Sequence, residues 1–190
     1  MRLKRIIIFL SLILLGRMAV VQGLLADELI TVEAALKDIF PQATQIVPET
    51  LKLTQTQIQE IATKARMEEG SLSKGEFRVH IAQKGREVIG YAFEDTVPGK
   101  WGPIDYLLGV YPHGKVIKVV VLSYQEKRGR PTAKPRFLKQ FIHKTAEDPL
   151  RLRKDINGIS GATVSSQAVT DGVRKLLNIF EEVYKIPALQ

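Results

Sequence analysis

Small and hydroxyl-bearing residues come directly before a long amphipathic segment, at Ser160, Gly161, Ala162, Thr163, Ser165 and Ser166. Apolar residues then recur at helical spacing, at Val169, Val173, Leu176, Leu177, Phe180, Val183 and Tyr184. A helix that begins here presents free N–H groups and the positive end of its dipole to an anion. Gly161 and Ala162 would let a ligand approach the backbone closely. The pattern therefore predicts a phosphate-binding loop that opens a helix, although ordinary N-capping explains the same residues and composition leaves both interpretations open.

Residues 155–165 resemble the flavinylation motif of the FMN-binding domain family, in which an Asp and a short spacer precede Ser/Thr-Gly-Ala-Thr-x-Ser/Thr. In that family the Thr after Gly-Ala carries FMN through a phosphoester bond, which a separate Mg-dependent flavin transferase forms from FAD. The resemblance thus implies covalent FMN on Thr163. It also implies further cofactor-binding residues, which are Asp155, Ser160, Gly161, Ala162, Val164 and Ser165.

The chemistry of Thr163 fits an external transferase. A Thr hydroxyl is a weak nucleophile that needs an activating base or metal, and neither His nor Cys lies near Thr163 in the sequence. Self-modification is therefore not expected, and Thr163→Ala should remove the covalent flavin while leaving the fold intact.

Residues 95–103 contain the only Trp of the chain, together with two Gly and two Pro. Residues 99–104 are similar to a Gly-Lys/x-Gly-Pro-Ile segment of many family members. The resemblance implies that Trp101 covers one face of the isoalloxazine and that Lys100 lies close enough to favour its reduced form. A simple strand connection with one packed aromatic residue is the alternative.

Residues 123–131 follow an expected strand and match the family only in part. In the ion-pump subunits this place reads His-x-Glu-Thr-Pro-Gly and lies against the flavin. Glu126 matches the Glu, whereas Tyr124 replaces the His and Lys127-Arg128-Gly129 replaces Thr-Pro-Gly. Glu126 and Tyr124 remain candidate cofactor neighbours, and the departures favour a divergent, stand-alone member outside the sodium-pumping and Rnf complexes.

Residues 1–26 have the features of a targeting segment. Arg2, Lys4 and Arg5 precede an almost wholly apolar stretch, and small residues follow at Gly23 and Ala26. Both a cleaved signal peptide and a membrane anchor over residues 6–26 are consistent with the pattern, although Arg17 disfavours the anchor. Either interpretation predicts an extracytoplasmic location, in the periplasm or on the outer face of the cytoplasmic membrane.

The remaining chain, residues 27–190, is expected to form one α+β domain with an antiparallel sheet flanked by helices. We expect an N-terminal helical part over 27–72, with helices opened by Thr31 and Thr54 and a connector over 42–52. A flavin-binding core over 76–186 should contain strands at 76–83, 87–93, 104–111 and 115–122, a short helix at 136–141, and the helix after Ser166.

Composition narrows the function. The chain has no Cys, which excludes disulfides, thiolate metal sites and iron–sulfur clusters. Four of its 28 Lys and Arg residues precede residue 26, so the rest of the chain carries 24 against 20 acidic residues, a net charge of +4. That excess is too small to indicate nucleic-acid binding, and the three His residues follow no metal-ligand spacing.

Basic residues are nevertheless dense over 127–154, at Lys127, Arg128, Arg130, Lys134, Arg136, Lys139, Lys144, Arg151, Arg153 and Lys154. A solvated face explains them, and docking of an acidic redox partner or of anionic lipid is the alternative.

The sequence favours an extracytoplasmic electron carrier with FMN esterified to Thr163, which exchanges electrons with membrane or periplasmic donor and acceptor proteins. The flavin would supply the redox chemistry, and the protein its attachment and orientation. A cofactor-free assembly module of a membrane redox complex is the second hypothesis, and an intact Thr163 argues against it. A reductase of a diffusible substrate is the third.

Overall fold

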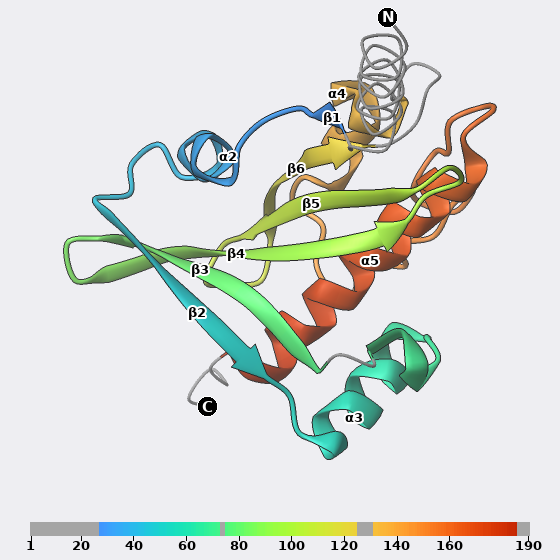
Figure 1. The fold of residues 1–190 in the computed structure, drawn as a ribbon. Coiled ribbons are helices and arrows are strands. Elements are labelled where there is room, and N and C mark those ends of the chain that lie inside the picture. Colours follow the sequence, from blue (N-terminus) through green and yellow to red (C-terminus); the bar gives the residue numbers. More distant parts are fainter. Residues whose placement is uncertain (1–26, 73–74, 125–130, 186–190) are drawn as a thin grey trace, which may run out of the picture.

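The computed structural model describes residues 27–72, 75–124 and 131–185, which form an antiparallel sheet with helices on both faces (Figure 1). The strand order is β1-β6-β5-β4-β3-β2. The strands are β1 (Asp27–Glu28), β2 (Gln45–Lys52), β3 (Glu76–Lys84), β4 (Glu87–Pro98), β5 (Pro103–Val110) and β6 (Val116–Tyr124). This arrangement confirms the predicted α+β class, whereas the predicted signal or anchor segment lies outside the described residues.

The helices are α2 (Val32–Ile39), α3 (Gln55–Ala65), α4 (Pro135–Leu138) and α5 (Thr163–Val183), with 3-10 turns η2 (Glu69–Leu72), η3 (Pro131–Ala133) and η4 (Lys139–Phe141). Helices α2 and α3 begin at the capping residues that the sequence predicts. The Thr31 hydroxyl accepts a hydrogen bond from the Ala34 N–H (3.2 Å), and Thr54 forms a capping box with Gln57. Within the described ranges, no helix combines the length and apolar character needed to cross a membrane.

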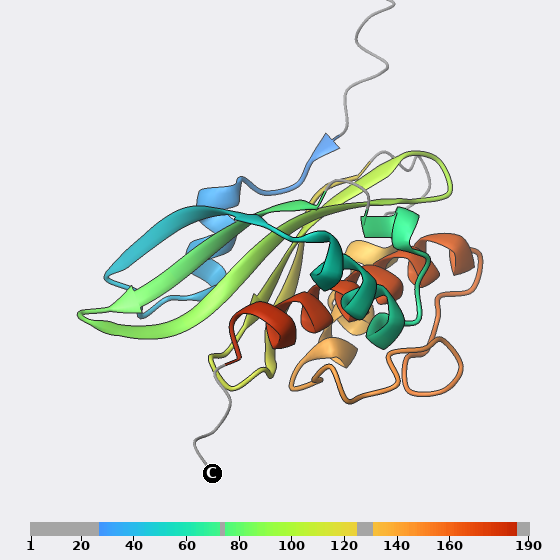
Figure 2. The ribbon, with the colours of Figure 1, turned by 90° about the horizontal axis from the view of Figure 1, so that it is seen from below.

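Two cores hold the layers together. Helices α5 and α3 pack on one face of the sheet, and α2 covers part of the other (Figure 2). The inward face predicted for the last helix is confirmed, because its apolar positions from Val169 to Phe180 are buried. The predicted short helix at 136–141 is also present, as α4 and η4, with Phe137 and Phe141 buried.

A buried polar contact fixes α5 against the sheet. Lys175 of α5 pairs with Asp95 of β4 (2.9 Å), and the Tyr106 hydroxyl donates a hydrogen bond to the same carboxylate (2.7 Å). Burial, followed by the negative charge of Asp95, raises the pKa of Tyr106 well above its ordinary value, so the phenol stays protonated. These contacts join α5 to β4, and β4 to β5, within the core.

The prediction of a connector over residues 42–52, within a helical N-terminal part, is wrong. Residues Gln45–Lys52 form strand β2, which pairs with β3 along its whole length. Pro48 is tolerated because β2 is the edge strand of the sheet and needs partners on one side only. Most of its side chains are exposed, so the sequence lacks the alternation of apolar and polar residues that indicates a strand.

The segment between the second and third predicted strands is also shorter than expected. Strand β4 continues to Pro98 and β5 begins at Pro103, so only residues 99–102 form the turn. The Thr96 hydroxyl donates to Asp105 across the two strands (2.7 Å), and the Gly99 N–H donates to the Gly102 carbonyl (2.8 Å). These bonds extend the hairpin and place Trp101 at its tip.

Candidate functional site

The predicted motif forms a loop that runs directly into α5. Gly161 has a φ of +81°, and a Cβ built on it would meet nothing within 4 Å. The next residue, Ala162, is the N-cap and has no side chain able to accept a hydrogen bond. The first N–H groups of an α-helix have no partner within the helix. An anion could therefore approach the positive N-terminal end of α5, because neither Gly161 nor Ala162 carries a large side chain.

The hydroxyl groups of the motif divide into two sets. Thr163 is exposed as the first residue of α5, and its neighbour Val164 has 54% of its surface exposed. Ser166 is buried, and its Oγ accepts from the Ile159 N–H (3.2 Å) and donates to the Ala162 carbonyl (2.8 Å). Ser166 therefore holds the loop closed, while the Thr163 hydroxyl is available to solvent or to a modifying enzyme.

The turn between β4 and β5 contacts this helix end directly. The Lys100 N–H donates a hydrogen bond to the buried Ser165 Oγ (3.2 Å), although these residues lie 65 positions apart. Trp101 has 66% of its surface exposed, and the Lys100 ammonium lies 5.1 Å from the centre of its ring. The turn that carries Lys100 and Trp101 therefore lies against the first turn of α5.

Asp155 anchors the start of the motif. Its carboxylate accepts hydrogen bonds from Lys144 Nζ (3.0 Å) and from the N–H groups of Arg151 (2.8 Å) and Leu150 (3.1 Å). Burial alone would raise the pKa of Asp155, but the two N–H donors and the Lys144 ammonium outweigh it and hold the pKa below its ordinary value. These bonds fix the backbone at the start of the motif, several residues before Thr163.

Gln140 grips the middle of the motif, a role that sequence reasoning missed. Its Oε1 accepts from the Asn157 N–H (2.8 Å), and its Nε2 donates to the Asn157 carbonyl (3.1 Å). Both polar groups of one backbone residue are therefore held by one side chain from the segment after α4. A lone Gln in a short helix gives no sequence signal for such a contact.

A pocket of about 600 Å³ lies between α4 and the motif loop. Its walls are Lys134, Arg136, Phe137, Gln140, Asn157, Gly158, Ile159 and Ser160. The volume falls in the range of small-molecule sites, and the lining combines an aromatic residue, two amides and two cations. The pocket reaches Ser160, three residues before Thr163, and can accept an aromatic group joined to an anion. Sequence reasoning noted Lys134 and Arg136 only within a basic stretch.

Two predicted site residues remain, and the partial match of residues 123–131 to the family had suggested both. Tyr124 is the last residue of β6, where it pairs with Ile104 and is 1% exposed, so its ring belongs to the core. Glu126 lies outside the described residues.

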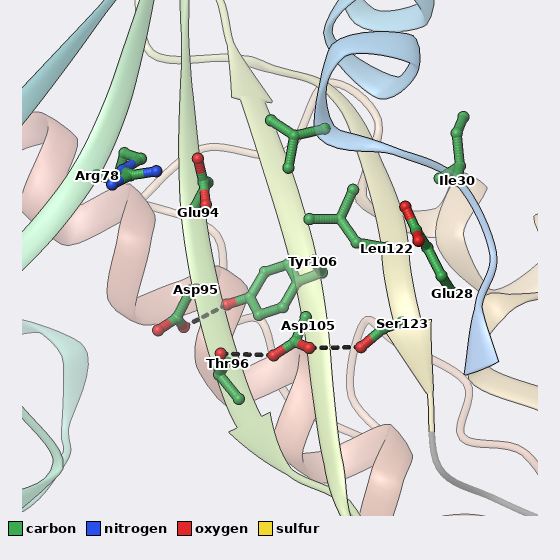
Figure 3. Close-up of a pocket in the computed structure, with 11 residues that line it drawn as sticks. Glu28, Ile30, Arg78, Glu94, Asp95, Thr96, Asp105, Tyr106, Leu122 and Ser123 are labelled. Carbon is green, nitrogen blue, oxygen red and sulfur yellow. Dashed lines mark hydrogen bonds between the residues drawn. The ribbon is translucent and has the colours of Figure 1, made fainter. Parts of the chain in front are cut away.

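A second pocket, of about 460 Å³, opens on the face of the sheet that α2 only partly covers (Figure 3). Its two Asp side chains have partners within the sheet: Asp105 accepts from Thr96 and Ser123, and Asp95 from Tyr106. These bonds align neighbouring strands. The pocket contains no residue of the predicted motif.

A family model described as the FMN-binding domain matches residues 99–178. The match includes the Trp101 turn, the pocket between α4 and the motif loop, and most of α5. It confirms the resemblance inferred from residues 155–165.

Three curated proteins are similar in sequence, and all of them are named as the G component of an oxidoreductase complex. The one from a proton-translocating ferredoxin:NAD+ oxidoreductase complex of Clostridium ljungdahlii is 38% identical over 104 residues, covering 50% of this chain and 56% of that protein. The one from a sodium-translocating complex of Acetobacterium woodii is 24% identical over 161 residues, covering 80% and 74%. The one from an ion-translocating complex of Pasteurella multocida is 29% identical over 119 residues, covering 56% and 59%. The chain thus spans a little over half the length of the first of these relatives.

Two solved structures share the fold at low sequence identity. NqrC from Shewanella oneidensis is 14% identical, with a TM-score of 0.51 over 78% of this chain and 85% of that chain. The corresponding component of the sodium-translocating NADH-quinone reductase from Parabacteroides distasonis is 15% identical, with a TM-score of 0.53 over 84% and 86%. At this identity the likeness shows the fold alone.

Proposed function

We propose that this chain, whose residues 99–178 match the FMN-binding domain model, is an electron-transfer flavoprotein with FMN esterified to Thr163. The exposure of the Thr163 hydroxyl at the start of α5 carries the proposal. It is the first residue of a long helix whose cap supplies no side-chain acceptor, and a pocket of suitable size begins three residues earlier. An attached phosphate would lie where the helix dipole favours negative charge.

The chemical character of the surrounding residues suits FMN. The pocket wall formed by Phe137 and Ile159 offers apolar surface for an isoalloxazine, and Gln140 and the motif backbone offer polar groups at its edge. At the first turn of α5, the Lys100–Ser165 bond holds the turn that carries Trp101. The bound flavin would supply reversible electron acceptance, and the protein supplies attachment, a fixed loop and a cationic surrounding.

The partners we propose are redox proteins of a membrane complex. The three relatives are named as parts of ion-translocating oxidoreductase complexes, which supports electron exchange with neighbouring proteins over reduction of a diffusible substrate. We further propose that the domain lies outside the cytoplasm and is flavinylated there by an FMN transferase. Residues 1–26 support this through their composition.

Asp27 directly follows residues 1–26 and lies at the same end of the sheet as the β4–β5 turn. Asp27 pairs with Tyr124, Tyr124 with Ile104, and Ile104 with Val97 next to the turn that contacts α5. At about 4.8 Å per strand, Asp27 and Val97 are about 15 Å apart. An anchor over residues 6–26 would therefore hold the flavin end of the domain at the membrane surface.

Intact mass spectrometry tests the proposal. The full chain is produced together with a Mg-dependent flavin transferase and FAD, in parallel with Thr163→Ala and with Thr56→Ala as a control at an exposed Thr of α3. We expect the wild type and Thr56→Ala to gain one FMN less one water, and Thr163→Ala to gain nothing.

Two outcomes would contradict the proposal. An unmodified wild type, beside a modified control substrate of the same transferase, would favour the cofactor-free assembly module. Modification of Thr163→Ala to the same extent as the wild type would show that another hydroxyl carries the flavin.

A further inference from the structure

We propose that Lys134 and Arg136 form a cationic wall that preferentially stabilises the reduced, negatively charged flavin and so raises its midpoint potential. This inference rests on the proposed function, since it requires FMN in the pocket between α4 and the motif loop. It assigns a tuning role to two residues that lie more than 25 positions before the attachment site in the sequence.

Both side chains line the pocket and neither is neutralised nearby. Lys134 and Arg136 share the pocket wall with Gly158 and Ser160 of the motif. Both residues are exposed, and no carboxylate in the described part of the chain forms an ion pair with either. Two acidic residues that follow them in the sequence, Asp148 and Asp155, are bound to Lys144. The positive charge of the wall is therefore available to a ligand.

The cations are carried by a segment with a fixed position. Pro135 begins α4 with a preset φ, and Phe137 and Phe141 bury their rings in the core on the inner side. Two hydrogen bonds from Gln140 then join this segment to Asn157 of the motif. Any group tethered to Thr163 and seated in the pocket therefore has both residues in its wall.

The N-terminus of α5 and the α4 cations would act on different parts of FMN. The phosphodiester carries one negative charge, and the N-terminus of α5 already lies at its attachment point. The α4 cations line the pocket on the other side of the motif loop, where the ring would lie. An oxidised isoalloxazine is uncharged, and it becomes an anion when it takes up two electrons and one proton. A cation beside the ring therefore favours the reduced form over the oxidised form.

The test compares two double variants with the same change of charge. Lys134→Gln with Arg136→Gln removes both pocket cations. Lys84→Gln with Arg86→Gln removes one Lys and one Arg from the exposed β3–β4 turn, at the far end of the 12-residue strand β4, on the order of 35 Å from the motif. Each protein is flavinylated, its FMN content is confirmed by intact mass, and its flavin is titrated with dithionite as reductant and ferricyanide as oxidant.

We expect the pocket variant to lose about tenfold in its preference for reduced over oxidised flavin, a fall in midpoint potential of about 30 mV for this two-electron couple. The hairpin variant should keep the wild-type potential, and Arg136→Lys should keep most of it because the charge remains. Equal potentials in all four proteins, with FMN attached, would overturn the tuning role while leaving the flavoprotein intact.

One further outcome would also overturn the inference. If the pocket variant fails to acquire FMN, whereas the hairpin variant is flavinylated at the wild-type rate, the cations serve recognition by the transferase. A failure of the proposed function itself is distinct, because then no variant and no wild-type protein acquires FMN.

Discussion

The Lys100 N–H donates a hydrogen bond to Ser165 Oγ (3.2 Å), which ties the tip of the β4–β5 hairpin to the first turn of α5. The bond joins the two segments that the sequence had marked separately, the Trp101 turn and the flavinylation motif. It makes Trp101, the only Trp of the chain, a natural reporter for whatever is attached to Thr163.

We predict that flavinylation quenches most of the Trp101 fluorescence. A flavin tethered to Thr163 would lie close to the indole, and its absorption overlaps Trp emission. The measurement compares emission of the flavinylated wild type with that of Thr163→Ala, to which an equal concentration of free FMN is added. Equal emission from the two samples would place the flavin away from the β4–β5 turn.

Ser165→Ala should loosen the same contact. The Lys100 N–H then loses its acceptor at a partly buried position, which costs about 1–2 kcal/mol of unfolding free energy. In a domain of this size that lowers the Tm by roughly 2–8 °C, and the quenching of Trp101 should weaken. Ser71→Ala, at an exposed residue of η2, is the matched control and should change neither quantity.

The partly buried Gln140 should matter for modification. Gln140→Ala removes both hydrogen bonds to Asn157, so the motif loop loses a grip worth about 1–2 kcal/mol. We expect the initial rate of FMN attachment, followed by intact mass, to fall severalfold. Gln59→Ala, on the exposed side of α3, controls for loss of a Gln, and an unchanged rate in Gln140→Ala would show that the transferase does not need a fixed loop.

Local sequence patterns predicted helices α2, α3 and α5. Thr31 and Thr54 mark helix starts because capping needs a hydroxyl at one defined position. The α5 face is readable because every third or fourth residue is apolar. The motif was found because residues 155–165 resemble a short and specific family sequence; the local pattern alone left ordinary N-capping open.

Contacts between residues far apart in the sequence produce no local pattern from which they could be predicted. Strand β2 is an exposed edge with Pro48 inside it, and only its pairing with β3 makes it a strand. The Gln140–Asn157 contact and the pocket cations depend on how α4 folds back on the motif loop. Tyr124 was expected beside the flavin from the partial family resemblance of residues 123–131, and that resemblance did not indicate that its ring is buried in the core through the register with Ile104.

Acid should remove the contribution of Asp155 to stability. Its pKa in the folded protein lies below the ordinary 3.8, so its stabilising effect is complete above that value and is lost as the pH falls through the lowered folded pKa. Urea unfolding should show Asp155→Asn less stable than the wild type by about 1–3 kcal/mol near neutral pH, with the difference shrinking below about pH 4.

Asp38→Asn is the matched control for this pH dependence. Asp38 also pairs with a lysine, Lys118 at 2.7 Å, but its side chain is 46% exposed. Exposed pairs contribute roughly 0–1 kcal/mol, so this variant should differ little from the wild type at any pH. A constant difference between Asp155→Asn and the wild type down to the acid transition would contradict the assigned pKa direction.

The close approach of α5 to the sheet gives a last prediction, at Gly172. A Cβ at this position would overlap the Tyr106 hydroxyl and would lie 2.8 Å from Val97 Cγ1. Because Tyr106 is fully buried and bonded to Asp95, neither neighbour can move freely. Gly172→Ala should therefore lower the unfolding free energy by about 1–3 kcal/mol, even though Ala is the better helix former.

Gly70→Ala tests the same substitution where space is open, since a Cβ there meets nothing within 4 Å. Its effect should stay within about 0.5 kcal/mol. Because Gly172 lies nine residues beyond Thr163, flavinylation of folded Gly172→Ala should continue at the wild-type rate. Equal stability of the two variants in urea unfolding would mean that α5 does not lie against Tyr106 and Val97, and the position of the flavin-bearing helix end would then need another explanation.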